Sequence, residues 1–166
     1  YIVTALLFIL GGINSVSAVT DSSSVESANV IVDSPGIFAQ PFNESFRTPN
    51  DEVVTVGNPQ LKDSYTYEDF SGETQIKTAP EGEQYVFVNI SVKNDAGGVV
   101  SAPNRLNFEL ATDTTQQEPL YRTQYERNDG YDGLNNNLDG VVEKGVLPYL
   151  VNEDATADDL RLFYDY

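Results

Sequence analysis

The chain of 166 residues carries 26 acidic and 9 basic side chains, which give it a formal net charge of −17. A surface of this sign repels nucleic acid and anionic lipid, so we expect no nucleic-acid partner. The sequence has no Cys and no His, which excludes disulfides, cysteine metal sites and the usual histidine base or zinc ligand. The acids are scattered rather than clustered, so we interpret them as the solvated surface of a halophilic protein; a cation-collecting surface is the alternative.

The N-terminus predicts export. Residues 1–13 form an uncharged apolar run, and residues 14–18 follow with small side chains at Val16 and Ala18. This pattern is typical of a secretory signal peptide over residues 1–18, with cleavage after Ala18. The run is short for a membrane span of about 20 residues. A retained anchor or pilin-like assembly helix is the alternative, and the chain would contact a membrane only in that case.

Residues 19–50 are predicted to be a flexible acidic, Ser-rich linker that is partly attached to the following domain. Residues 19–29 are rich in Ser and poor in large apolar side chains, as in flexible spacers. Residues 30–32 fit a short strand. Four apolar side chains could attach the segment to the domain: Ile37, Phe38, Phe42 and Phe46.

Residues 51–166 are predicted to form the folded domain, organised around a central strand at residues 84–93. Val86, Val88, Ile90 and Val92 alternate there with Tyr85, Phe87, Asn89 and Ser91. Alternate side chains of a strand point to opposite faces, so the β-branched row should face the core. The question is whether the opposite row lies in solvent or beneath the N-terminal segment.

Short strands and turns are predicted along the rest of the domain. The candidate strands are residues 52–57, 61–70, 74–78, 106–110, 119–126, 141–151 and 160–166. Residues 128–140 read as a loop, and residues 154–159 fit one helical turn. Strands at this spacing, without a long helix, predict an all-β fold: an immunoglobulin-like antiparallel β-sandwich of seven to eight strands.

The order of these strands resembles a known family. The strand at residues 85–94 ends in Lys93 and Asn94, and residues 107–110, 140–149 and 160–162 supply the later motifs. This order resembles the DUF4352 family, an immunoglobulin-like extracellular domain of secreted and lipid-anchored prokaryotic proteins, over about residues 53–166. The acidic composition looks like that of a haloarchaeal member. The resemblance implies a β-architecture and no catalytic residues, and the lipid-attachment Cys of many relatives is absent.

Residues 128–140 contain a candidate Ca²⁺ loop. With Asn128 as position 1, Asp132 stands at position 5 and Asp139 at position 12, which partly matches a twelve-residue Ca²⁺ loop, although position 12 is Asp rather than Glu. Position 3 is Gly130 and no helices flank the segment. A polar loop between strands is the alternative, because Asn, Asp and Gly are common turn residues. Ca²⁺ is the one cofactor that the sequence suggests.

Asn43 and Asn89 each begin an N-glycosylation sequon. Asn43 lies in a segment expected to be exposed, whereas Asn89 is usable only if its face of the central strand is solvated. Tyrosines at 65, 67, 121, 125 and 131 could form a sugar-stacking platform, although tyrosine is also a common strand residue.

No sequence motif indicates catalysis. Adjacent acids such as Glu68 and Asp69 point to opposite faces of a strand, and no nucleophile or phosphate-loop motif is present. We therefore predict a secreted or surface-located, non-enzymatic module that binds a protein or glycan. A structural subunit of a surface filament or envelope layer, anchored by its N-terminus, is the alternative.

Overall fold

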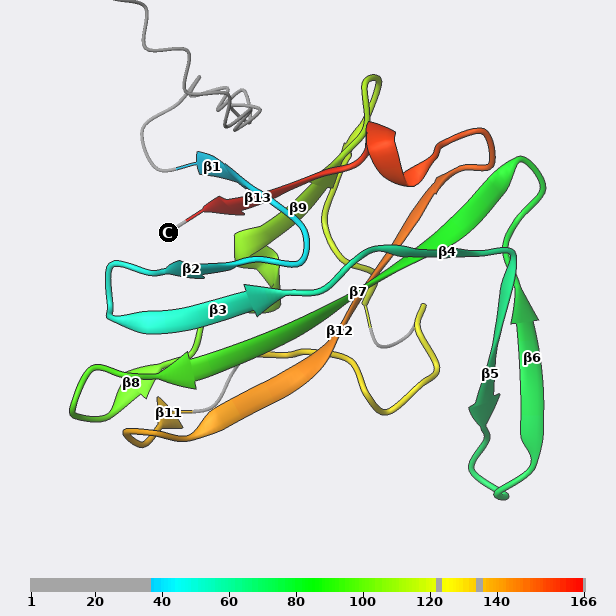
Figure 1. The fold of residues 1–166 in the computed structure, drawn as a ribbon. Coiled ribbons are helices and arrows are strands. Elements are labelled where there is room, and N and C mark those ends of the chain that lie inside the picture. The colour runs from blue at the N-terminus through cyan, green and yellow to red at the C-terminus, as the bar shows by residue number, and fades with distance from the viewer. Residues whose placement is uncertain (1–36, 122–123, 134–135, 166) are drawn as a thin grey trace, which may run out of the picture.

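The computed structural model describes residues 37–121, 124–133 and 136–165, and these residues form an almost entirely β structure (Figure 1). Helical structure in these ranges is limited to two 3-10 turns, η1 (Arg105–Asn107) and η2 (Ala157–Asp159). None of the described helices has the length and hydropathy needed to cross a membrane. The predicted signal peptide, residues 19–36 and the predicted strand at residues 30–32 lie outside the described residues.

A five-stranded antiparallel sheet forms one layer. Its order is β12 (Val142–Asn152), β7 (Glu83–Asn94), β3 (Glu52–Val56) and β2 (Ser45–Arg47), and β4 (Gln60–Lys62) pairs with the first half of β7. Eleven residue pairs join β7 to β12, so the strand predicted to be central does occupy the centre.

A four-stranded antiparallel sheet faces it. Its order is β1 (Ile37–Gln40), β13 (Arg161–Asp165), β9 (Phe108–Ala111) and β10 (Gln116–Gln117). Two small pairs complete the fold: β8 (Val100–Ser101) with β11 (Asn136–Asn137), and the hairpin of β5 (Ser64–Glu68) and β6 (Thr74–Thr78). The predicted antiparallel β-sandwich architecture is confirmed.

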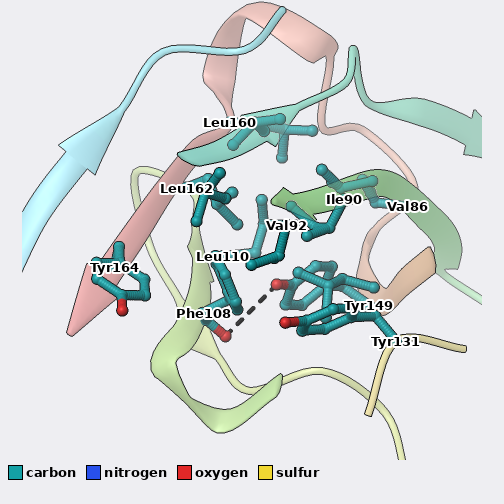
Figure 2. Close-up of a cluster of buried hydrophobic side chains, with 14 of the residues drawn as sticks. Val86, Ile90, Val92, Phe108, Leu110, Tyr131, Tyr149, Leu160, Leu162 and Tyr164 are labelled. Carbon is teal, nitrogen blue, oxygen red and sulfur yellow. Dashed lines mark hydrogen bonds between the residues drawn. The ribbon is translucent and has the colours of Figure 1, made fainter. Parts of the chain in front are cut away.

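The core lies between the two large sheets. The predicted inner row of β7 is buried there, together with Phe108 and Leu110 of β9 and Leu162 of β13. Figure 2 shows Tyr149 of β12 donating its hydroxyl to the carbonyl oxygen of Phe108, 3.4 Å away, which links the layers. Complete burial raises the pKa of Tyr149 well above its ordinary value, so this hydroxyl stays protonated and donates.

Several local predictions need correction. Residues 119–126 form no strand in their described part: the backbone N–H groups of Gln124 and Tyr125 both donate to the carbonyl oxygen of Tyr121 at 2.8 Å, which is a turn. Residues 128–140 are not only loop, because β11 lies among them. The predicted strand at residues 61–70 is divided between β4 and β5, and the described residues form thirteen strands, more than the predicted seven to eight.

Part of the predicted linker is attached to the sandwich. Strand β1 pairs with β13, and β2 pairs with β3, so each large sheet receives one strand from residues 37–47. Phe46 of β2 packs against the core and contacts Tyr164 of β13 in a tilted arrangement, with ring centroids 5.1 Å apart. Neither strand covers the outer face of β7 at Tyr85 and Phe87; the β5–β6 hairpin does that.

Candidate functional site

The β5–β6 hairpin projects from one end of the sandwich (Figure 1) and is held there by aromatic packing. The Tyr65 ring lies 4.9 Å from Tyr85, 5.7 Å from Phe87 and 5.3 Å from Tyr125, between centroids. Tyr65 is buried, and its hydroxyl oxygen accepts a bond from the backbone N–H of Glu126 at 3.2 Å. These contacts form a second small core, separate from the main one, that fixes the hairpin to the sheet.

The segment of residues 124–129 runs beside the hairpin and is bonded to it. Lys77 of β6 donates from Nζ to the carbonyl oxygen of Gln124 at 2.8 Å and to Oε1 of Glu126 at 3.1 Å. The Tyr125 hydroxyl donates to Oδ1 of Asp129 at 2.9 Å, and burial followed by this bond raises the pKa of Tyr125. Bonds from Lys77 therefore hold the segment against the hairpin, and the bond from Tyr125 to Asp129 holds its two ends together.

The tip of the hairpin is an ordered turn organised by Asp69. Its carboxylate accepts bonds from the backbone N–H of Ser71 (2.9 Å), the Ser71 hydroxyl (2.6 Å), the backbone N–H of Glu73 (3.0 Å) and the Gln75 amide (2.9 Å). These bonds, the Ser71 hydroxyl first, lower the pKa of Asp69 to about 2, so the carboxylate is ionised at any physiological pH. Gly72 completes the turn at φ +83°, a conformation that suits glycine.

Phe70 stands at this tip with its side chain fully exposed. Because the turn that carries this aromatic ring is ordered, a partner that covers it has to order the side chain but not the backbone. Glu68, Asp69 and Glu73 surround it in sequence, so the apolar tip has an acidic rim. The hairpin thus presents an exposed aromatic side chain on an ordered, negatively charged turn.

A groove lies between the hairpin and residues 126–129. It has a volume of about 580 Å³, and its walls are Thr66, Tyr67, Glu68 and Thr74 on one side and Glu126, Arg127, Asn128 and Asp129 on the other. A second hollow of about 440 Å³ shares part of this lining and reaches Phe70 at the tip. Arg127 is occupied by an ion pair with Asp129. The groove therefore offers one half-buried aromatic ring among carboxylates and amides.

Another hollow, of about 560 Å³, lies beyond Asn128 and Asp129 on the outer face of the five-stranded sheet. Gly57, Gly130 and Gly145 contribute backbone to its lining, and Asn89, Ser91 and Lys144 contribute polar side chains. Asn128 and Asp129 line both this hollow and the groove, so they form the ridge between the two.

The structure separates the residues of the predicted Ca²⁺ loop. The carbonyl oxygen of Asp129, next to Asn128, accepts from the N–H of Val146, which pairs with Asn89 of β7. At the other end Oδ1 of Asp139 accepts from the N–H of Gly97, and Gly140 bonds to Asn94. Asn89 and Asn94 are five residues apart along β7, so the two ends of the predicted Ca²⁺ loop lie about 16 Å apart.

Asp132 binds elsewhere, because its carbonyl oxygen accepts from the N–H of Arg105 at 3.3 Å. Among residues 37–121, 124–133 and 136–165, no group of three or more Asp, Glu, His or Cys side chains is placed to hold a metal ion. The geometry adds no support for Asn128, Asp132 and Asp139 as one site, and Ca²⁺ binding by this loop stays a prediction.

Both sequon asparagines are exposed. Asn43 lies in the turn between β1 and β2 at φ +61°, and Asn89 lies on the outer face of β7 within the 560 Å³ hollow. The outer face of β7 is therefore mixed: Tyr85 and Phe87 are covered by the hairpin and Asn89 is open to solvent. Glycosylation at either position stays a prediction.

The tyrosines do not form one platform. Tyr65, Tyr125 and Tyr131 are buried, and Tyr131 donates its hydroxyl to the carbonyl oxygen of Pro103 at 2.8 Å inside the main core. Tyr121 is half exposed but is covered on one face by the Arg105 guanidinium, 4.0 Å from its ring centroid. The sequence predicts Phe70 at the end of a strand, whereas the structure places it in the turn after β5. The Asp-Phe-Ser-Gly order of residues 69–72 is the sequence signal for this turn.

Comparisons with known proteins give no functional information. No family model matches the chain, and no curated protein is similar to it. A solved structure, described as a conserved hypothetical protein from Bacillus anthracis, is 18% identical, with a TM-score of 0.44 over 72% of this chain and 84% of the other. The resemblance to DUF4352 accordingly stays a prediction.

Proposed function

We propose that this chain is an exported, non-enzymatic β-sandwich module that binds a protein partner at or outside the cell surface, with the β5–β6 hairpin as its contact element. The observation that carries the proposal is the fully exposed Phe70 on a turn ordered by Asp69. Aromatic anchors on segments that are ordered before binding are typical of interaction hot spots.

The charge around the tip indicates the chemistry of the partner. Phe70 stands among Glu68, Asp69 and Glu73, so a matching surface has an apolar pocket with a basic rim. Burying the phenyl ring in such a pocket contributes about 1.5–3 kcal/mol. Its loss therefore weakens binding roughly 10- to 100-fold.

Site-specific photocrosslinking tests the proposal. The full chain with Phe70→p-benzoylphenylalanine is added to intact cells of the source organism, and the same probe in place of Val99 serves as the control. Val99 is also exposed but lies in the loop before β8, at the opposite end of β7. We expect a discrete protein adduct from position 70 that is absent from position 99.

The affinity of the identified partner then decides the role of the ring. We expect Phe70→Ser to weaken binding by roughly 10-fold or more, and the exposed neighbour Ile76→Ser to have a smaller effect. An unchanged dissociation constant in Phe70→Ser contradicts the proposal. Loss of binding on enzymatic deglycosylation of the partner, with Phe70→Ser still active, assigns the groove to a glycan instead.

Export is tested separately by N-terminal sequencing of the protein from the native host. We expect a mature chain that begins at Val19. A start at or before Tyr1 contradicts simple secretion and favours the N-terminally anchored filament or envelope subunit.

A further inference from the structure

Three neighbouring strands of the large sheet carry polar side chains at the same end of their core-facing rows. Glu52 of β3 lies directly opposite Asn94 of β7, and Glu143 of β12 lies opposite Val92, two residues before Asn94. Residues two apart on a strand share a face, so Glu52, Asn94 and Glu143 all point toward the interior between the sheets. We name this region, together with Asn137 of β11 and Thr48 before β3, the polar end of the core.

The two asparagines of the polar end are structural. The Asn94 amide donates to the carbonyl oxygens of Gly98 at 2.6 Å and Asn137 at 2.7 Å, and its oxygen accepts from the N–H of Ala96 at 2.9 Å. Asn94 thus joins the ends of β7, β8 and β11. The Asn137 amide in turn donates to Oε2 of Glu143 at 3.4 Å, which holds that carboxylate at the polar end.

Glu52 is the unusual member. Its side chain is 1% exposed; Oε2 accepts from the Thr48 hydroxyl at 3.3 Å, whereas Oε1 is buried with no hydrogen-bond partner among the described residues. Burial raises the pKa of Glu52, the Thr48 bond opposes this, and the nearby Glu143 charge adds to it. A buried carboxylate with an unpaired oxygen needs a compensating group, such as a proton, a water molecule or a cation.

We propose that Glu52 and Glu143 bind a hard cation of the Ca²⁺ class at the polar end of the core. Both side chains offer carboxylate oxygens, which Ca²⁺ prefers, and a chain without Cys or His offers no ligands for softer metals. Two carboxylates are fewer than the about 6–8 oxygens that Ca²⁺ takes, so water and the neighbouring amide or hydroxyl oxygens complete the shell. Glu143 is half-buried, which leaves the ion a route from solvent.

This site is separate from the Ca²⁺ loop predicted from sequence, because it uses neither Asn128, Asp132 nor Asp139. It also does not depend on the hairpin, so failure of either proposal leaves the other in place. Its physical basis is charge neutralisation: a divalent cation between two carboxylates removes both their mutual repulsion and the cost of the unpaired oxygen.

Calorimetric titration with CaCl₂ tests the proposal on protein first treated with EDTA. A background of about 0.5 M NaCl screens weak binding by surface acids. We expect one saturable site in the wild type and an affinity at least tenfold lower in Glu52→Gln and in Glu143→Gln. Asp132→Asn removes one carboxylate of the sequence-predicted loop and is the matched control, with unchanged affinity.

Three outcomes overturn the proposal. The first is no saturable heat in the wild type, which leaves a proton or water at Glu52. The second is wild-type affinity in both Glu52→Gln and Glu143→Gln. The third is loss of binding in Asp132→Asn alone, which assigns the ion to the loop. If Glu52→Gln does not fold, Glu143→Gln decides, because its half-buried side chain tolerates the amide.

Discussion

Replacing Tyr65 by alanine should detach the β5–β6 hairpin while the main core stays folded. Tyr65 is buried in the small aromatic core, which shares no residue with the main core of the sandwich. Truncating a buried aromatic side chain costs about 3–5 kcal/mol. A two-stranded hairpin without packing is marginally stable at best. The lost free energy therefore exceeds the stability of the hairpin, and the hairpin opens locally.

Native-state hydrogen exchange measures this opening residue by residue. We expect amide protection in β5 and β6 to fall roughly 200- to 5,000-fold in Tyr65→Ala, and protection in β9 and β13 to change by less than about tenfold. Tyr65→Phe is the matched control, since it removes only the bond from the Glu126 N–H and costs about 1 kcal/mol. Equal loss of protection in the hairpin and in β13 would refute the reasoning, because the two cores would then unfold as one.

Three further predictions concern the sandwich itself. The pKa of Glu52 lies above its ordinary value of 4.5, so the stabilisation from its protonated form is complete only below the unfolded-state pKa. In EDTA, the free energy of unfolding should therefore fall as the pH rises through the folded-state pKa of Glu52. Urea titrations at several pH values measure this slope, and Glu52→Gln should flatten it. Gly145→Ala should cost about 1–3 kcal/mol in urea denaturation, because a Cβ there would lie 2.6 Å from the Cα of Tyr131; wild-type stability would contradict that contact. The melting temperature should rise between about 0.1 M and 2 M NaCl, because salt screens the net charge of −17, and a salt-independent value would count against a halophilic surface.

The sequence predicts best where one strand has two distinct faces. Val86, Val88, Ile90 and Val92 are buried as expected, because an alternating row has one way to be covered in a sandwich. The short strand at residues 74–78 was also predicted with the bounds that the structure shows. In both places the local pattern contains the information that the fold uses.

Prediction fails where long-range packing decides the conformation. Residues 119–126 have strand-like apolar spacing, but Tyr125 packs against both Tyr65 and Phe87, and the chain turns to place it there. Glu52 begins a β-rich run like any solvated acid, and only the pairing with Asn94 shows that it points inward. The groove could not be predicted from the sequence either, because the residues of its two walls are about 60 positions apart in the chain.

The pairing of β1 with β13 has a mechanical consequence. Ile37 pairs with Asp165 at the end of a four-residue antiparallel ladder, where the described part of the chain begins. Among the described residues β1 pairs with no other strand, whereas β7 and β12 are joined by eleven residue pairs. Under tension applied at Ile37, β1 would therefore detach before the five-stranded sheet opens, and the hairpin would stay in place.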